Sequence, residues 1–293
     1  MHIDVLLNPI DLRRLAIVCV LVLCFFAAAQ DQSSPLPPAK LVREVVANEL
    51  AERLQQPKWI YVIEKREGNQ TLTEEQVETN DGPFYRLLAI NGAPLDPDQR
   101  QKDDARMDSL LHDPSQLLKL KRARDEDEQR LEALIRLMPD AFLYDYDGVE
   151  GNLVRLKFHP NAAYNPPTYE ARVVHSLAGT ILIDMQQRRL AKLSSRLIDR
   201  VEFGYGFLGH IDNGGTIEIR RAPVGPSQWK TSLINIQLSG RLVFFKTISK
   251  QEYETRSDFR AVSAGLSLTQ ASQLLHARSA SPLVPVVVSS PEQ

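Results

Sequence analysis

The amino-acid sequence predicts an α+β protein: a strongly curved antiparallel β half-barrel of about eleven strands, capped by α-helices. From residue 141 to residue 249, apolar side chains recur at every second position in short runs, and Gly, Asn, Asp or Pro residues separate these runs. No helical segment is evident between neighbouring runs, so the strands are expected to pair antiparallel. Twist makes a sheet of about ten strands curve. Only the helical segments at residues 38–56 and 97–138 could cover its concave apolar face.

Residues 1–29 have the three parts of a secretory signal peptide. Arg13 and Arg14 precede an apolar run at residues 15–29, which ends in three alanines. A membrane-spanning helix needs about 20 apolar residues, so cleavage near residue 29 is favoured over a retained anchor. The only two cysteines, Cys19 and Cys24, lie inside this run. The mature chain is therefore expected to be periplasmic, exported across the inner membrane, without disulfides or thiol nucleophiles.

The first part of the mature chain should contain a linker, one helix and three strands. Residues 30–38 are a Pro- and Ser-rich linker, and apolar residues at helical spacing follow over residues 38–56. The period then changes to two at residues 59–64, and a predicted Gly68-Asn69 turn leads to a polar run at residues 71–79. A third run spans residues 84–90. The last run ends at Asn91-Gly92, which is a strong hairpin signal because both central residues of the favoured turn need positive φ.

Residues 97–138 predict a helical insert. One apolar stripe contains Met107, Leu110 and Leu111, and a second contains Leu131, Leu134, Ile135 and Met138. Residues 119–130, between the stripes, are dense in both signs of charge, with opposite charges four positions apart. Such pairs can support a helix that is fully solvated, and the alternative is that this segment docks a partner.

The remaining strands are expected to complete one domain over residues 39–260. They are predicted at residues 141–146, 152–158, 172–184, 188–198, 200–208, 215–222, 228–239 and 241–249. Residues 261–293 are rich in Ser, Ala, Pro and Val, and are expected to form a loose C-terminal tail.

Several segments resemble the lipoprotein-carrier superfamily, which includes the LolA and LolB carriers and the sigma-factor regulator RseB. These segments are an exported N-terminal helix, Tyr-Arg-Leu-Leu at residues 85–88 before the Asn91-Gly92 turn, and Gly-Thr-Ile-Leu-Ile-Asp at residues 179–184 followed by a second strand. Asp184 has a physical reason to stand there, because its side chain can accept a hydrogen bond from the turn backbone. The charged insert and the loop at residues 159–168 set the chain apart as a separate bacterial branch. The resemblance implies a half-barrel whose hydrophobic inner face receives acyl chains or an acylated protein.

Charge and motif content argue against most other classes of protein. With 35 Lys and Arg against 37 Asp and Glu, the net charge of −2 offers no basic surplus for nucleic acid. The G-x-G-x-x-G string at residues 204–209 alternates with aromatic residues and precedes a turn, so a strand is favoured over a dinucleotide site.

The candidate chemical groups do not form a recognisable active site or metal site. The histidines show no metal-ligand spacing, and no cofactor is expected. A carboxylate cluster contains Asp145, Asp147 and Glu150. These three residues suit a hairpin turn better than a calcium loop, and a hydrolase that uses them is the least favoured hypothesis.

The chain is therefore expected to be a non-catalytic binding protein for a hydrophobic small molecule, a lipid or an acylated protein. The predicted ligand-binding residues are apolar and alternate along the strands: Ile181, Ile183, Phe203, Tyr205, Ile217, Ile219, Ile236 and Phe244. If the helices leave a gap over this face, each buried CH₂ group of a ligand gains about 0.8 kcal/mol. If they leave none, the face is ordinary core. The alternative function is an envelope scaffold or sensor that acts through contacts with another envelope protein.

Overall fold

The computed structural model describes residues 36–53, 57–203, 209–242 and 246–279, and the fold belongs to the compact unit that begins at Pro38. The predicted signal peptide and most of the predicted linker lie outside the described residues. The helices are α2 (Pro38–Arg53), α3 (Pro97–His112), α4 (Pro114–Ala141), α5 (Tyr169–His175) and α6 (Leu268–Ser279). The strands are β1 (Lys58–Glu67), β2 (Gln70–Thr79), β3 (Gly82–Ile90), β4 (Ala93–Pro94), β5 (Phe142–Glu150), β6 (Leu153–Pro160), β7 (Leu177–Asp184), β8 (Arg189–Leu197), β9 (Val201–Phe203), β10 (Gly209–Ile211), β11 (Thr216–Pro223), β12 (Trp229–Leu242) and β13 (Lys246–Val262). None of the described helices has the length and hydropathy needed to cross a membrane.

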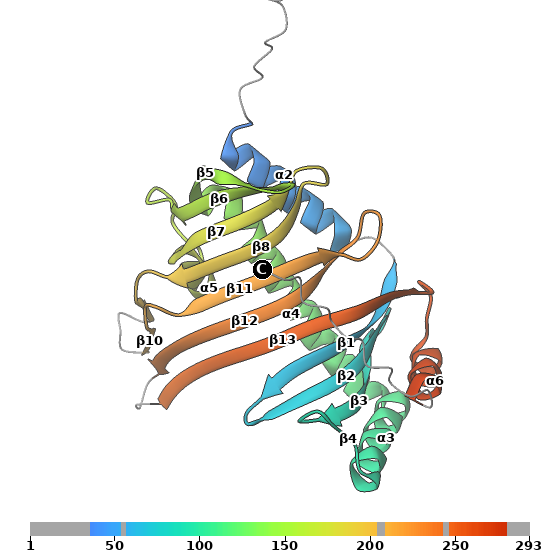
Figure 1. The fold of residues 1–293 in the computed structure, drawn as a ribbon. Helices are drawn as coiled ribbons and strands as arrows, with labels where there is room; N and C mark the ends of the chain where they lie inside the picture. The colour runs from blue at the N-terminus through green and yellow to red at the C-terminus, as the bar shows by residue number, and fades with distance from the viewer. Residues whose placement is uncertain (1–35, 54–56, 204–208, 243–245, 280–293) are drawn as a thin grey trace, which may run out of the picture. The chain divides into compact units, whose positions relative to one another are not determined.

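The described strands form one antiparallel sheet of 13 strands, which confirms an α+β fold with a large antiparallel sheet. Along the sheet the order is β4-β3-β2-β1-β13-β12-β11-β8-β7-β6-β5, with β10 and β9 attached beyond β12. The N-terminal strands and the strands from β5 to β8 occupy opposite ends, and β11 to β13 lie between them (Figure 1). The two end strands, β4 and β5, do not pair with each other, so the sheet stays open.

Bulges contribute to the curvature of this sheet. The register shifts at Thr73/Glu74 in β2, Ile60/Val62 in β1 and Arg220/Arg221 in β11, and similar shifts occur in β5 and β7. An extra residue in one strand bends that strand and increases its local twist. Opposite the shift in β1, Asp258 of β13 has a φ of 57°. These bulges cannot be located from apolar alternation, because each shifts the period by a single residue.

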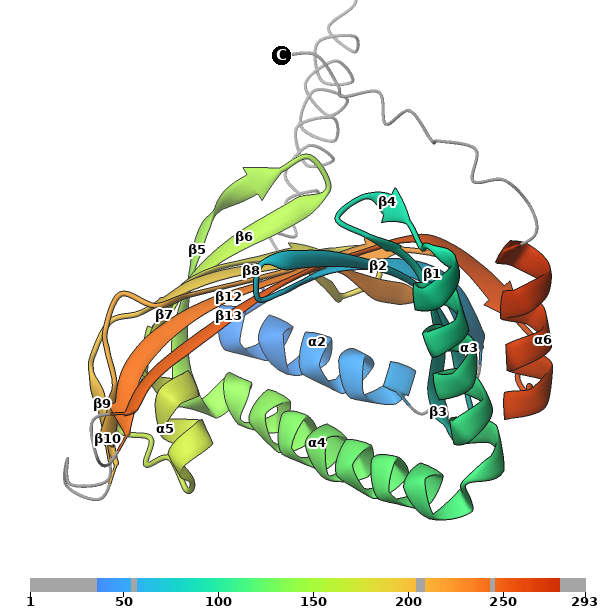
Figure 2. The ribbon, with the colours of Figure 1, turned by 90° about the horizontal axis from the view of Figure 1, so that it is seen from below.

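Helices lie on both faces of the sheet. Figure 2 shows α2 inside the curve, with α4 beneath it, and we call this side the inner face. On β1, Ile60 packs with Met107 of α3 and Leu275 of α6, whereas Tyr61 belongs to a separate cluster. Because successive side chains of a strand point to opposite sides, α3 and α6 cover the outer face of β1 to β3. The sequence predicted that residues 38–56 and 97–138 would both cover the inner face. Within residues 97–138 only α4 does so, because α3 lies on the outer face.

Helix α3 also protects the exposed edge of β3. The carboxylate of Asp103 accepts a hydrogen bond from the Leu87 backbone N–H at 3.1 Å, and Arg106 donates to the Tyr85 carbonyl oxygen at 2.7 Å. Both bonds satisfy edge groups of β3 that could otherwise pair with another strand.

Two segments differ from the sequence-based expectations. The strand predicted from residue 172 begins only at Leu177, because residues 169–175 form α5, with Thr168 as its N-cap. Such a short apolar run does not distinguish strand from helix. Within the predicted tail, residues 268–279 form α6. Ser267 and Gln270 hydrogen-bond to each other's backbone N–H, a capping-box pattern visible in the sequence.

Three predicted turns are confirmed. Gly68 has a φ of 59° between β1 and β2, and Asn91 and Gly92 have φ of 53° and 76° between β3 and β4. Asp184 accepts a hydrogen bond from the Gln187 N–H at 2.7 Å in the turn between β7 and β8.

Candidate functional site

Apolar side chains form rows across the inner face of the sheet. Strand pairing aligns one row of Ile181, Leu193, Ile219 and Ile234. The neighbouring row contains Gly179, Ser195, Ile217 and Ile236. Paired residues in an antiparallel sheet share a face, so four strands contribute to one continuous apolar surface.

Burial decreases along this surface from β7 towards β12. Ile181 and Ile183 of β7 are 4% and 0% exposed, and α2 packs against β8 and β5, on either side of this strand. In contrast, Ile217, Ile219 and Ile236 are only half-buried. The first two predicted residues are therefore core, whereas the last three keep contact with solvent on a face that is otherwise covered by helices.

The other predicted ligand-binding residues lie elsewhere or are not described. Phe203 on β9 is half-buried, and its ring lies edge-on to Tyr169 of α5, with centroids 5.4 Å apart. Through β10 and β12, Phe203 shares the inner face with Ile236, but it lies at the far end of the sheet. Tyr205 and the side chain of Phe244 lie outside the described residues. The structure thus brings Ile217, Ile219 and Ile236 together.

Charged residues on β13 border the apolar surface. Ile234 pairs with Glu254 and Ile236 pairs with Glu252. Glu254 forms an ion pair with Arg256, whose guanidinium lies 5.7 Å from the centroid of the Tyr61 ring. Both sets of alternating positions along β13 contain charged and polar residues. The sequence alone therefore does not identify β13 as the strand that borders the apolar surface.

A buried ionic cluster holds the C-terminal half of α2 against the sheet. We call this cluster the α2 anchor: Glu49 and Glu52 of α2, Arg189 of β8 and Arg221 of β11, whose side chains are 8–14% exposed. Glu52 lies 3.2 Å from Arg189 and 2.9 Å from Arg221, and it accepts a hydrogen bond from the Trp229 N–H at 2.6 Å. Burial lowers the pKa of Arg221 to about 10, so its guanidinium stays charged at neutral pH. The anchor fixes how much of the inner face α2 covers.

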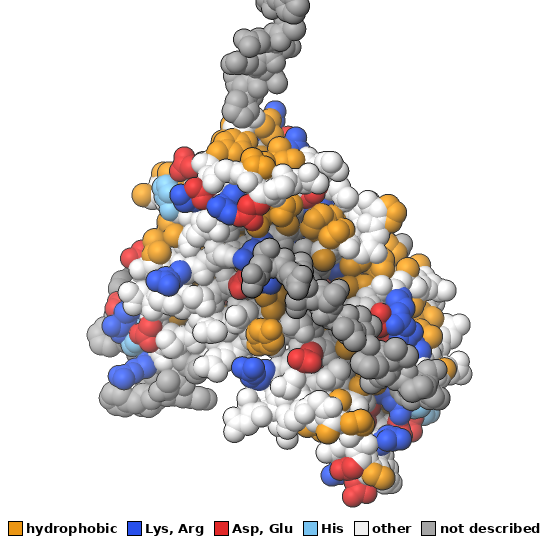
Figure 3. All heavy atoms as spheres, in the orientation of Figure 1, with side chains coloured by type: hydrophobic (Ala, Val, Ile, Leu, Met, Phe, Trp, Pro, Cys, Tyr) orange, Lys and Arg blue, Asp and Glu red, His pale blue; other side chains and the backbone are white. Residues whose placement is uncertain are grey.

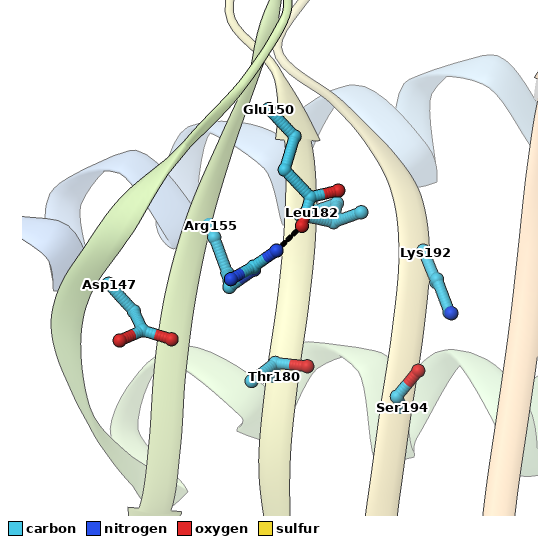
Figure 4. A pocket seen from close by; sticks show the side chains of 7 residues that line it. All are labelled: Asp147, Glu150, Arg155, Thr180, Leu182, Lys192 and Ser194. Carbon is cyan, nitrogen blue, oxygen red and sulfur yellow. Dashed lines mark ion pairs between the residues drawn. The ribbon is translucent and has the colours of Figure 1, made fainter. Parts of the chain in front are cut away.

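A polar cavity of about 320 Å³ lies on the outer face, where the β5–β6 hairpin bends over β7 and β8 (Figure 4). It is lined by Asp147, Glu150, Arg155, Thr180, Leu182, Lys192 and Ser194. Asp147 lies 2.5 Å from Lys157, and Glu150 is ion-paired with Arg155. Figure 3 shows scattered charged side chains on this side, with hydrophobic side chains among them. On β11 the outer face carries Thr216, Glu218 and Arg220, whereas the inner face carries Ile217 and Ile219.

A second cavity, of about 470 Å³, lies between the end of α5 and the start of β9. Its lining is Pro166, Arg172, His175, Ser176, Arg200, Val201 and Glu202. None of the predicted ligand-binding residues that the structure describes lines either of these two cavities. Sequence reasoning missed the second cavity because its residues come from a loop, a short helix and a strand start without periodicity.

The structure places the other candidate groups apart from the inner face. Asp147 and Glu150 are ion-paired at the outer cavity, and Asp145 is exposed. Among the described residues, no three His, Cys, Asp or Glu side chains are grouped so that they could hold a metal ion. Residues 204–208 of the G-x-G-x-x-G string are not described, and Gly209 begins strand β10 rather than a helix.

Comparison of the chain with family models, with curated proteins and with solved structures found no match.

Proposed function

We propose that this protein is an exported, non-catalytic binding protein of the periplasm, whose inner sheet face receives a hydrophobic ligand: an acyl chain, a lipid or a lipidated protein. The observation that supports this most directly is the partial exposure of Ile217, Ile219 and Ile236 on the helix-covered face. A filled core would bury these residues as completely as Ile183.

The energetics favour a chain-like ligand. Each CH₂ group moved from water onto this surface gains about 0.8 kcal/mol, so ten CH₂ groups gain roughly 8 kcal/mol. The loss of translational and rotational freedom offsets several kcal/mol of this gain. A ligand with one alkyl chain of about this length would therefore bind weakly and exchange readily, as a carrier requires.

The ion pairs of the carboxylates support binding rather than hydrolysis. Asp147 and Glu150 each pair with a cation at the polar cavity, so neither lies in the apolar pocket that a carboxylic general acid commonly needs. Replacing Asp145, Asp147 and Glu150 together should leave ligand binding unchanged. Loss of a hydrolytic activity on an envelope substrate in that triple variant would favour a hydrolase instead.

Binding of a lipophilic fluorescent dye tests the proposed function. Ile236→Ser should weaken dye binding, because it places a hydroxyl on the inner face. Asn235→Ser is the matched control, since the neighbouring side chain points to the outer face and should not affect binding. Equal binding by both variants, together with no acyl-bearing molecule in mass spectra of protein purified from its host envelope, would contradict the proposal.

A second candidate function rests on α4. Leu118, Leu120 and Leu131 are 45–52% exposed on this helix, next to its charged segment. Such side chains could dock another envelope protein, which would make the sheet a scaffold or sensor. Charge reversal at residues 126–128 should then abolish partner capture while dye binding persists, whereas the carrier function predicts that partner capture is unaffected.

A further inference from the structure

The cavity between α5 and β9 carries more positive than negative charge. Arg172 and Arg200 line it, and Glu202 is the only acidic residue among the described residues of its lining. Within the part of the chain that the structure describes, neither guanidinium forms an ion pair with a carboxylate. Both cations are therefore available to an anionic ligand.

Local contacts orient both guanidinium groups. The Arg172 guanidinium lies 4.5 Å from the centroid of the Tyr169 ring, one turn earlier on α5. Arg200 Nη2 lies 2.6 Å from Nδ1 of His210, and Nε2 of that histidine lies 3.2 Å from the Asp212 carboxylate. Each contact leaves several of the five N–H donors of the arginine unused.

The third basic side chain of the cavity is held by the backbone. His175 Nε2 lies 3.1 Å from the carbonyl oxygen of Asn161, which can only accept, so Nε2 carries a proton. The Ser176 hydroxyl donates to the Arg172 carbonyl oxygen at 3.0 Å. The walls of the cavity are thus built by hydrogen bonds before a ligand arrives.

The cavity borders the inner apolar face. Val201, which is 5% exposed, lines it and lies on the inner face with Phe203. Ser176, which lines the cavity, directly precedes Leu177, and Leu177 pairs with Leu197 two residues along the sheet from the row of Ser195, Ile217 and Ile236. Ile217 therefore lies about 7 Å along the strands from the Leu177 row and two strand spacings, about 10 Å, across the sheet, so one ligand can place a head group in the cavity and a long alkyl chain on the isoleucines.

We propose that this cavity binds the anionic head group, phosphate or carboxylate, of an amphiphile whose chain lies along the inner face. This inference rests on the proposed function and adds a ligand class to it: single- or double-chain anionic amphiphiles rather than neutral ones. Arginine suits the role because its planar fork pairs with phosphate and carboxylate oxygens through two parallel hydrogen bonds.

Calorimetric titration of the full chain tests the inference with three probes: dodecyl phosphate, dodecyl maltoside and inorganic phosphate. The two dodecyl ligands are kept below the concentration at which they form micelles. The wild-type protein should bind dodecyl phosphate about tenfold more tightly than dodecyl maltoside. Raising the salt concentration should reduce this preference. The double variant Arg172→Gln/Arg200→Gln should lose the preference while keeping its affinity for dodecyl maltoside, which also shows that it folds. Arg220→Gln is the control: it removes a cation from the outer face, where the Arg220 side chain is 54% exposed, and this variant should still prefer dodecyl phosphate.

Each other outcome contradicts either the head-group site alone or the head-group site together with the proposed function. Equal binding of both dodecyl ligands by the wild-type protein, or an unchanged preference in the double variant, overturns the head-group site and leaves the proposed function standing. Binding of inorganic phosphate without either dodecyl ligand identifies a site for free anions and overturns both the head-group assignment and the proposed function. Binding of none of the three probes also overturns both.

Discussion

The α2 anchor offers a quantitative test of how the inner face is covered. The change is Glu52→Gln, which removes the charge but keeps an oxygen that can accept from the Trp229 N–H. Glu52 contacts two arginines, Arg189 at 3.2 Å and Arg221 at 2.9 Å. The substitution therefore leaves two guanidinium groups, 8% and 14% exposed, with only Glu49 as their acidic partner in the anchor.

Removing one partner of a buried ion pair costs about 3–5 kcal/mol, because the remaining charge stays desolvated. Because these side chains are still slightly exposed and Glu49 remains as a partner, we expect the free energy of unfolding to fall by about 3 kcal/mol, near the lower end of that range. The free energy of unfolding should be measured by urea denaturation at neutral pH.

Glu44→Gln is the matched control on the same helix. Glu44 lies 3.6 Å from Arg188, but the two side chains are 41% and 33% exposed. A pair this exposed contributes about 0–1 kcal/mol. Equal losses in the two variants would refute the reasoning that burial gives the α2 anchor its strength.

Three further predictions follow from burial and backbone geometry. Gly179→Ala should destabilise the protein by about 3 kcal/mol, because the new Cβ would lie 2.0 Å from a backbone oxygen of β8. In the control Gly265→Ala the new Cβ would have no atom within 4 Å, so a drop in melting temperature is expected for the first variant only. Ile183→Ala should cost about 4 kcal/mol in urea denaturation and Ile219→Ala about 1–2 kcal/mol, and equal costs would show that the inner face is uniformly filled. Burial raises the pKa of Tyr61 to about 12, so the neutral phenol contributes fully to stability below pH 10, and this contribution is lost as the pH rises towards 12. In Tyr61→Phe the free energy of unfolding should fall less steeply over this pH range. An equally steep fall in the variant would show that another group causes the pH dependence.

The strands and their turns were predictable because their signals are local. Alternating apolar residues, the Asn91-Gly92 turn and the role of Asp184 each depend on residues within a few positions of one another. The α5 boundary failed because a short apolar run fits either periodicity. Helix α6 could have been found from the Ser267–Gln270 capping pattern and the apolar spacing after it.

The features that define the candidate site depend on long-range pairing. Glu52 and Arg221 are 169 positions apart, and in the sequence each resembles an ordinary solvated charge. The difference in burial between Ile183 and Ile219 depends on where α2 lies, which no period along the strands encodes. Sequence patterns therefore predicted which residues alternate, but not which of them α2 leaves accessible.

An environment-sensitive fluorophore on a single cysteine tests the central claim most directly. In a chain with Cys19 and Cys24 replaced by serine, the label is placed at residue 236 in one sample and at residue 235 in the other. Titration with dodecyl maltoside should produce a saturable blue shift at residue 236 and none at residue 235, because the two side chains lie on opposite faces of β12. Equal shifts at both positions, or no shift at residue 236, would contradict the account of the inner face as the binding surface.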